Sequence, residues 1–202
     1  MNNDKEKIIK AASDVFFTRG FYKIPIDDIA VSLKMSKKTI YKHFATKDEL
    51  VREVAYQFIK IHSSNISNII NNEFNAVEKL FHIFRYLGNM LISINEKWFS
   101  DIQSQAPEIW TEIEVFRSRF MTQNISKIIE QGKKEKYVVN YPSPIMINVF
   151  ISSIRGIINP AFIVNSKIPA FKALESTLDI LMNGILTLKG KNLLKKLNME
   201  KV

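Results

Sequence analysis

The chain has 202 residues, 46% of them hydrophobic and 24% charged, and a formal net charge of +9, which suits one large domain or two smaller ones. It has no cysteine and only three widely spaced histidines, so disulfide frameworks and thiolate metal sites are excluded, and we expect no metal and no cofactor. The sequence does not open on an apolar run, and Asn148, Arg155 and Pro160 interrupt its most apolar window; we therefore expect a cytoplasmic protein with no signal peptide and no membrane span.

The positive charge gathers at the two ends of the chain. Residues 1–60 carry 12 basic and 8 acidic side chains, residues 61–188 carry 12 and 11, and residues 189–202 carry 5 and 1. Five lysines and no acid lie between Lys34 and Lys47. Such a cluster attracts polyanions, but a solvated lysine face has the same composition, so charge alone leaves both interpretations open.

The first 60 residues predict four helices. A helix over 4–19 is followed by Gly20, where a helix C-terminal stop is expected. A short helix follows Pro25, and Ser36 is a candidate N-cap for another short helix. A capping box over 46–49 then opens a long helix.

The rest of the chain is also predicted to be helical. Apolar residues at steps of three and four predict helices over about 74–94, 107–132, 144–159 and 169–188, with Pro160 stopping the third of these. The basic tail, 189–202, fits either a frayed amphipathic helix or an added contact with DNA or membrane. Together these patterns predict an all-α fold of about nine helices, with an N-terminal three-helix helix-turn-helix domain and a C-terminal helical bundle domain.

The stretch 27–44 predicts a helix-turn-helix. Ile29, Ala30 and Leu33 on the first short helix can pack against Ile40 and Phe44 on the second. The second helix then exposes a basic, polar face that fits the major groove of DNA. The residues on this face are Lys37, Lys38, Thr39, Tyr41, Lys42 and His43.

A pattern of residues over about 6–54 resembles the N-terminal domain of TetR/AcrR-type regulators. The matching residues are Ile9, Ala11, Ala12, Phe16, Gly20, Phe21, Ile29, Ala30, Ser36, Thr39, Ile40, Tyr41, His43, Phe44, Lys47 and Leu50. The resemblance implies that Tyr41, His43 and Lys47 contact DNA phosphates. It implies base and backbone contacts for Lys37, Lys38, Thr39 and Lys42.

The chain departs from the family pattern at three places. Ile24-Pro25 stands where the family usually has Thr or Ser, which removes a helix-capping hydroxyl and a phosphate contact. Lys34 stands where the turn usually has Gly, so Lys34 would have to adopt an unusual backbone conformation. Lys38 replaces the usual Gly or Pro before the threonine.

The resemblance also implies a two-domain organisation, with DNA binding in 1–48 and ligand binding and dimerisation in 49–202. An effector pocket is expected within the C-terminal helices, and its ligand is expected to be apolar or aromatic. The pocket candidates are Phe84, Met90, Trp98, Trp110, Phe120, Phe150 and Arg155. For Arg155, an anionic ligand, an intersubunit ion pair and exposure at the helix edge all stay open.

Two features suggest a homodimer. A heptad-like seam in the last long helix and small residues in the helix before it suit a four-helix dimer interface. The interface candidates are Ser152, Gly156, Phe171, Leu174, Leu178, Leu181 and Ile185. Packing within one chain is the alternative explanation of the same pattern.

We therefore expect a ligand-responsive transcriptional regulator, by family default a repressor, that binds a palindromic double-stranded DNA operator as a dimer. The alternative is a helical small-molecule-binding or scaffold protein whose DNA-binding head has degenerated, given Ile24-Pro25 and Lys34. No nucleophile–base pair or phosphate loop is present in the sequence, so we assign no catalytic residue and expect no enzyme.

Overall fold

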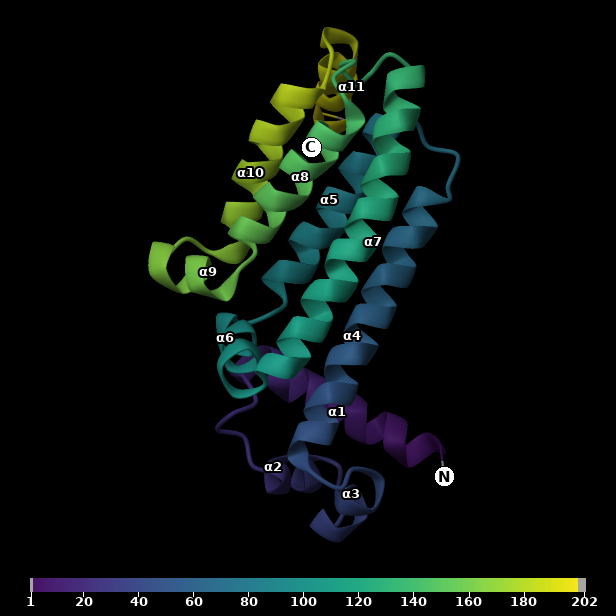
Figure 1. Ribbon diagram of the computed structural model, residues 1–202. Helices are drawn as coiled ribbons and strands as arrows, with labels where there is room; N and C mark the ends of the chain where they lie inside the picture. Colours follow the sequence, from purple (N-terminus) through teal and green to yellow (C-terminus); the bar gives the residue numbers. More distant parts are fainter. Residues whose placement is uncertain (1, 200–202) are drawn as a thin grey trace. The chain divides into compact units, whose positions relative to one another are not determined.

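A computed structural model describes residues 2–199, with the side chains of all of these except 2, 160 and 164. The described residues form eleven helices and no strand, which confirms the all-α prediction (Figure 1). The helices are α1 Asn2–Arg19, α2 Ile26–Ser32, α3 Lys37–His43, α4 Lys47–Ile70, α5 Ala76–Ile92, α6 Glu96–Gln105, α7 Pro107–Lys134, α8 Ser143–Ile157, α9 Pro160–Ser166, α10 Ala170–Ile185 and α11 Leu188–Met199. The shorter helices α6 and α9 account for the difference from the predicted nine. Within the described range, no helix combines the length and hydropathy that crossing a bilayer requires.

The chain forms two compact units. Unit 1 comprises Met1–His62 and Ser93–Ile113, and unit 2 comprises Ser63–Ile92 and Glu114–Val202. Helices α4 and α7 contribute residues to both units. The predicted boundary after residue 48 separates DNA binding from ligand binding, and not two compact units, so it stays a prediction.

Unit 1 has an aromatic core where α1 packs against α2 and α6. The Trp98 ring of α6 lies 4.8 Å from Phe17, 5.7 Å from Phe21 and 6.5 Å from Phe16, measured between centroids. Phe16 is fully buried and Trp98 is 3% exposed. Such aromatic contacts add to the hydrophobic effect of burial, so these rings hold α6 against the first helix.

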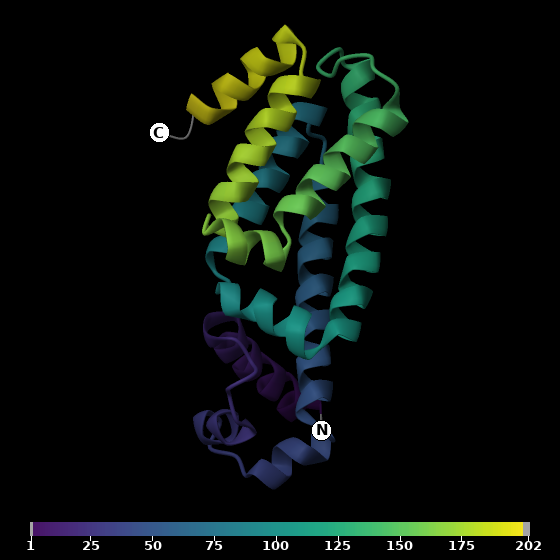
Figure 2. The ribbon, with the colours of Figure 1, turned by 60° about the vertical axis from the view of Figure 1, so that its left-hand side comes forward.

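Unit 2 is built around α5, which packs against α10 and α11, while α10 also packs against α8 and α8 contacts α9 (Figures 1 and 2). Gly88 permits the approach of α10, because a Cβ at this position would lie 3.1 Å from the Phe171 ring. The segments after α7 and α10 meet in an isolated antiparallel bridge between Val138 and Leu186.

One predicted boundary is incomplete. Pro160 was expected only to end a helix, but it also begins α9, with the Asn159 side chain accepting a hydrogen bond from the Ala161 N–H at 2.9 Å. Proline suits the first helical position because its fixed φ matches the helix and its missing N–H has no intrahelical partner there.

Candidate nucleic-acid interface and effector region

The helix-turn-helix is held together by apolar packing and by a side-chain cap. Ile29 and Ile40 are fully buried and Phe44 is 1% exposed, as the sequence predicted for the contact between α2 and α3. Ser36 is the N-cap of α3, and its hydroxyl accepts a hydrogen bond from the Thr39 N–H at 3.0 Å. This cap satisfies one of the free amides at the start of a helix that is too short to be stable alone.

The turn between α2 and α3 contains Lys34 with a φ of 53°. The Met35 N–H donates to the Ala30 carbonyl at 2.9 Å across this turn. A positive φ is unfavourable for a residue with a Cβ, so the expectation of an unusual backbone conformation at Lys34 is confirmed. The departure from glycine therefore has a cost in the stability of the turn.

The outward side of α3 carries Lys38, Tyr41 and Lys42, all exposed. Within the described residues, neither Lys38 nor Lys42 takes part in an ion pair. Both ammonium groups can therefore meet an anionic partner without first breaking an ion pair. Lysine can donate to guanine acceptors or to phosphate oxygens, and tyrosine can donate its hydroxyl to phosphate.

Two other predicted contact residues already have partners. Lys37 Nζ lies 3.0 Å from Asp27 Oδ2, and this hydrogen bond raises the pKa of Lys37. The Thr39 hydroxyl lies 2.8 Å from that of Ser36. His43, half-buried, lies in the last turn of α3, where a basic side chain is favourable.

Lys47 lies at the start of α4 and is half-buried. The capping box at this point is present, because the Thr46 hydroxyl accepts from the Glu49 N–H at 3.1 Å and the Glu49 carboxylate accepts from the Ala45 N–H at 2.7 Å. Lys47 Nζ donates to the Tyr22 carbonyl at 2.9 Å, and burial lowers the pKa of Lys47. Lys47 therefore holds the loop between α1 and α2, in addition to the phosphate contact that the resemblance implies.

Asp101 of α6 holds the same loop from its other side, and the sequence analysis missed it. Its Oδ2 accepts from the Tyr22 N–H at 2.8 Å. Gly20 makes the approach possible, because a Cβ there would lie 2.5 Å from the same oxygen. Tyr22 and Asp101 are 79 residues apart in the chain, and no local sequence signal connects them.

A second cluster missed by the sequence analysis connects α4 to the first turns of α7 within unit 1. Arg52 Nη1 donates to both carboxylate oxygens of Glu112 at 2.7 Å, and the Tyr56 hydroxyl donates to the same carboxylate. The hydrogen bonds from Tyr56 and Arg52 lower the pKa of Glu112, with Tyr56 contributing more than Arg52. The cluster is exposed, so it fixes side-chain geometry more than it adds stability.

The arrangement of α1 to α4 agrees with the comparison to known families. The sequence model of the family described as "Bacterial regulatory proteins, tetR family" matches residues 8–54. The HTH-type transcriptional regulator YvaF of Bacillus subtilis is 25% identical to this chain over 168 residues, which cover 83% of this chain and 87% of that protein.

Residues 8–54 therefore form a DNA-binding domain of the type found in TetR-family transcriptional regulators. The function of this family is ligand-responsive, DNA-binding regulation of transcription, and its members bind operators and small molecules as dimers.

Another relative is the HTH-type negative transcriptional regulator IcaR of the biofilm operon of Staphylococcus aureus, 27% identical over 95 residues, or 46% of this chain and 49% of that one. The crystal structure of a TetR-family regulator from Agrobacterium tumefaciens superposes with a TM-score of 0.70 at 15% identity, over 92% of this chain and 99% of that one. This likeness extends the TetR fold to unit 2, beyond the matched 8–54.

The predicted effector-pocket residues fall into both units. Trp98 belongs to the aromatic core of unit 1 described above, and Trp110 also lies in unit 1. In unit 2, Phe84 of α5 stacks on Phe150 of α8 with ring centroids 6.0 Å apart. Phe120 of α7 is half-buried. Because Trp98 is committed to packing against α1, we do not assign it to the pocket.

Two further predicted pocket residues lie in unit 2. Met90 of α5 is half-buried. Arg155 of α8 pairs with Glu114 of α7, with its Nε 3.4 Å from the carboxylate. Arg155 therefore has an ion-pair partner in its own chain and a partly exposed side chain, and the anionic ligand and the intersubunit ion pair stay open.

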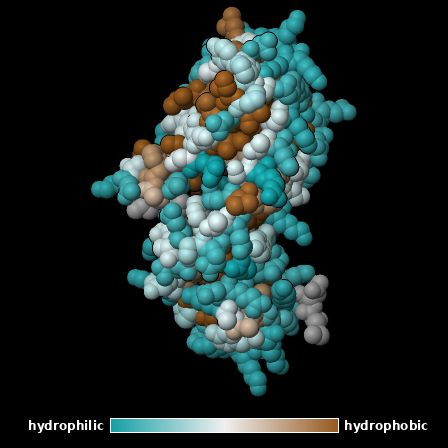
Figure 3. Space-filling model, in the orientation of Figure 1, coloured by the Kyte–Doolittle hydropathy of each residue, from teal (hydrophilic) through white to brown (hydrophobic). Residues whose placement is uncertain are grey.

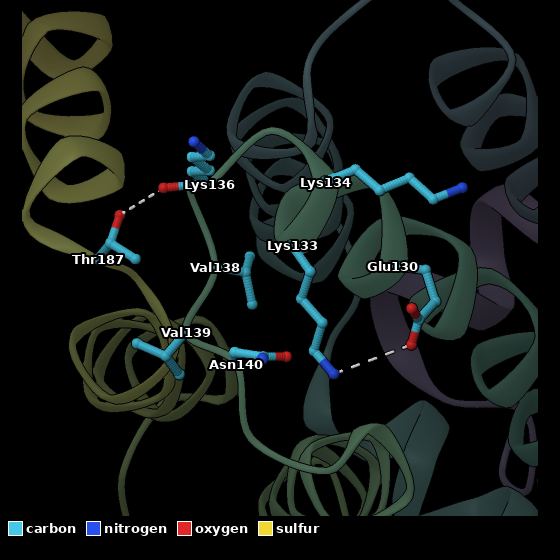
Figure 4. Close-up of a pocket in the computed structure, with 8 residues that line it drawn as sticks. All are labelled: Glu130, Lys133, Lys134, Lys136, Val138, Val139, Asn140 and Thr187. Carbon is cyan, nitrogen blue, oxygen red and sulfur yellow. Dashed lines mark hydrogen bonds and ion pairs between the residues drawn. The ribbon is translucent and has the colours of Figure 1, made fainter.

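An open hollow in unit 2, about 540 Å³ in volume, was not predicted (Figure 4). It lies between the end of α7, the segment that follows and Thr187, and its lining residues are Glu130, Lys133, Lys134, Lys136, Val138, Val139, Asn140 and Thr187. Lys133 Nζ donates to the Tyr141 carbonyl at 2.6 Å, and Figure 4 shows it directed toward Glu130. The Lys133 ammonium group therefore ties the segment between α7 and α8 to the end of α7.

The predicted dimer seam of α10 is wrong for three of its residues. Leu174, Leu178 and Leu181 are 2%, 6% and 7% exposed, because α10 turns this face toward α5 and α8 of its own chain. Phe171 contacts Gly88 of α5 while remaining 37% exposed, and Ile185 is half-buried. The heptad-like pattern does mark a helix-packing surface, but for the three leucines the packing is within one chain, which was the alternative explanation of the pattern.

The two small residues predicted for the interface lie on the other face of this helix pair. Ser152 and Gly156 of α8 are exposed, and a Cβ built on Gly156 would have no neighbour within 4 Å. Ile145 and Val149 continue the same stripe, since the four positions follow one another at steps of four, three and four. The stripe therefore offers a surface of small and apolar side chains against which another helix can pack.

Proposed function

We propose that this chain is a dimeric repressor that binds a palindromic operator through α3 and the start of α4, and that a small effector in unit 2 changes its affinity for DNA. The observation that carries this proposal is the outward face of α3. Lys38, Tyr41 and Lys42 project from it, while Ile40 and Phe44 are buried beneath it. A short, capped helix with this division suits insertion into the major groove.

The roles proposed for the individual residues follow from their contacts. Lys38 and Lys42 contact base edges and phosphates directly, and Tyr41 contacts phosphate. Lys37 and Thr39 support the start of α3 through Asp27 and Ser36 and contact the DNA backbone. His43, at the end of α3, and Lys47, at the start of α4, contact phosphates.

The proposed dimer uses the outer faces of α8 and α10. Exposed apolar side chains on these helices include Val149, 52% exposed, and Ile180, 71% exposed. Figure 3 shows apolar side chains gathered over the part of unit 2 where Figure 1 draws α8 and α10. Exposed apolar patches of this kind mark interaction surfaces in soluble proteins. A two-fold axis here would pair α8 and α10 with the same helices of a second copy.

The two-fold dimer presents its α3 helices to successive major grooves about 34–36 Å apart. Helix α4 carries Lys47 at its first residue and contributes its last turns to unit 2, so it is the proposed link between effector and DNA. A coupling of about 1–3 kcal/mol changes DNA affinity by roughly 5- to 150-fold. The proposed effector has an apolar or aromatic body, in keeping with Phe84, Phe120 and Phe150.

Fluorescence anisotropy with labelled DNA tests the proposal. The DNA upstream of the gene for this chain is compared with a coding fragment of equal length and base composition. Specific binding that is about 10³-fold or more tighter than non-specific binding supports operator recognition. Equal binding of both fragments would instead favour the degenerated head, for which the strained Lys34 in the turn is the structural argument.

A further inference from the structure

Unit 2 contains an ionic cluster formed by one carboxylate and two guanidinium groups. Glu114 and Arg117 lie one turn apart on α7, with Arg117 Nη1 2.9 Å from Glu114 Oε1. Arg155 reaches the other oxygen, Oε2, from α8 with its Nε at 3.4 Å. Two positive charges therefore share one negative charge, and the cluster has a net charge of +1.

Two members of the cluster are largely buried, and the third is partly exposed. The side chains of Glu114 and Arg117 are 18% and 24% exposed, and that of Arg155 is 46% exposed. Burial lowers the pKa of Arg117; Glu114 acts against this shift and Arg155 adds to it. A buried guanidinium keeps its charge at neutral pH, so the missing negative charge has a free-energy cost that an added anion would remove.

The internal pairing also has imperfect hydrogen-bond geometry. Glu114 Oε1 is buried and has no hydrogen-bond partner among the described residues, although Arg117 is within ion-pair distance. A guanidinium has five N–H donors in a planar fork that matches a carboxylate bidentately. Glu114 therefore compensates charge here without the geometry of a good arginine–carboxylate pair.

Apolar side chains flank the cluster along both helices. Arg155 is the single charged residue of α8, and the neighbouring Ile154 is buried. On α7, Phe120 follows Arg117 by three residues and its ring stacks on Phe116 at 5.9 Å. A ligand that fits this chemistry has a negatively charged group and an apolar body.

We infer that the effector is an amphipathic organic carboxylate, whose charged group is bound by Arg117 and Arg155 and whose apolar body packs among the aromatic side chains of unit 2. Glu114 is the internal competitor that occupies the arginines when no ligand is present. This inference rests on the proposed ligand response and names the chemical class of the ligand. Arg117 was not among the residues predicted from sequence.

The competition between Glu114 and the ligand gives a sharp test. The increase in Tm is measured for the full chain with four probes at equal concentrations: decanoate, decanamide, 1-naphthoate and 1-naphthamide. A ligand that binds only the folded state raises Tm according to its affinity, so acid and amide can be compared directly. We expect at least one acid to bind about tenfold or more tightly than its matched amide.

Three variants assign the preference to the cluster. Glu114→Gln removes the competitor, and we expect it to increase acid affinity severalfold although Tm without ligand falls. Arg117→Gln should abolish the preference for acid over amide, and it is measured also in the Glu114→Gln background, where no carboxylate is left unpaired. Arg119→Gln, at an exposed arginine of the same helix, should retain the preference.

Two other results would overturn the inference. One is an equal response, or none, to acid and amide in both the chain and Glu114→Gln; the other is an acid preference that survives Arg117→Gln. DNA binding is measured on the same samples by anisotropy. Specific DNA binding without acid preference refutes the ligand class alone, whereas loss of specific DNA binding refutes the proposed function and leaves the ligand result standing.

Discussion

The reading head, α2 to the start of α4, and the α8–α10 pair of unit 2 differ in where their polar and apolar partners come from. In the head, Ser36 caps Thr39 and Thr46 caps Glu49, both three residues away. In the other region the apolar face of α10 packs against α5, roughly a hundred residues earlier in the chain. The structure of the head can therefore be predicted from neighbouring residues in the sequence. The function of α8 and α10 depends instead on which of their faces stay exposed after the chain has folded.

The largest expected effect breaks the exposed face of α8 and α10. Ile180→Asp places a charge at the centre of the proposed dimer interface, where an unpaired buried charge costs several kcal/mol. We expect a monomer in sedimentation equilibrium and a loss of operator affinity of about 100-fold or more. Ile92→Asp, at a similarly exposed isoleucine of α5, should remain dimeric. A dimeric Ile180→Asp would show that this face is not the interface.

The next effect concerns the outward face of α3. Lys38→Ala removes a proposed contact to a base edge, which is worth about 1–3 kcal/mol of discrimination. Competition binding with single-base variants of the operator should show relaxed preference at one position of each half-site. A uniform loss across all sequences would assign Lys38 to phosphate instead.

Lys47 and Lys42 form a matched pair within the head. Each alanine variant should reduce the slope of log K against log salt by about 0.9, because one phosphate contact is lost. Lys47→Ala should also lower the free energy of unfolding by about 1 kcal/mol, because the Tyr22 carbonyl loses its donor, whereas Lys42→Ala should not. An unchanged salt slope in Lys47→Ala would leave it with the structural role only.

The smallest effect concerns the turn between α2 and α3. Lys34→Gly relieves the positive φ, and part of this gain is offset by the greater freedom of glycine in the unfolded chain. We expect unfolding in urea to become less favourable by about 0.5–1 kcal/mol. Lys23→Gly, at an exposed loop lysine without a positive φ, should not be stabilising. A destabilised Lys34→Gly would show that the lysine side chain contributes more than its backbone costs.

The same contrast explains what the sequence could predict. Gly20, Ser36, Thr46 and Pro107 mark helix ends within one turn, so the helices and the helix-turn-helix followed from local rules. The seam of α10 was correctly identified as packing surface, but a heptad pattern does not say whether its partner is in the same chain.

The polar contacts between residues far apart in the chain could not be predicted. Asp101 reaches Tyr22, and Arg155 reaches Glu114, over 79 and 41 residues. A single sequence contains no signal for such pairs, and side-chain type alone left Arg155 with three interpretations. Arg117 lies in a charged, amphipathic stretch of α7, where nothing distinguishes it from the exposed Arg119.

The most direct test of the central claim is one anisotropy titration of the triple variant Lys38→Ala/Tyr41→Ala/Lys42→Ala against the chain itself on the upstream fragment. These three side chains are exposed, so the variant should unfold at nearly the same Tm. Specific binding by this variant should fall to the level of the coding fragment. Specific binding that survives in the folded variant would contradict the assignment of α3 as the reading helix.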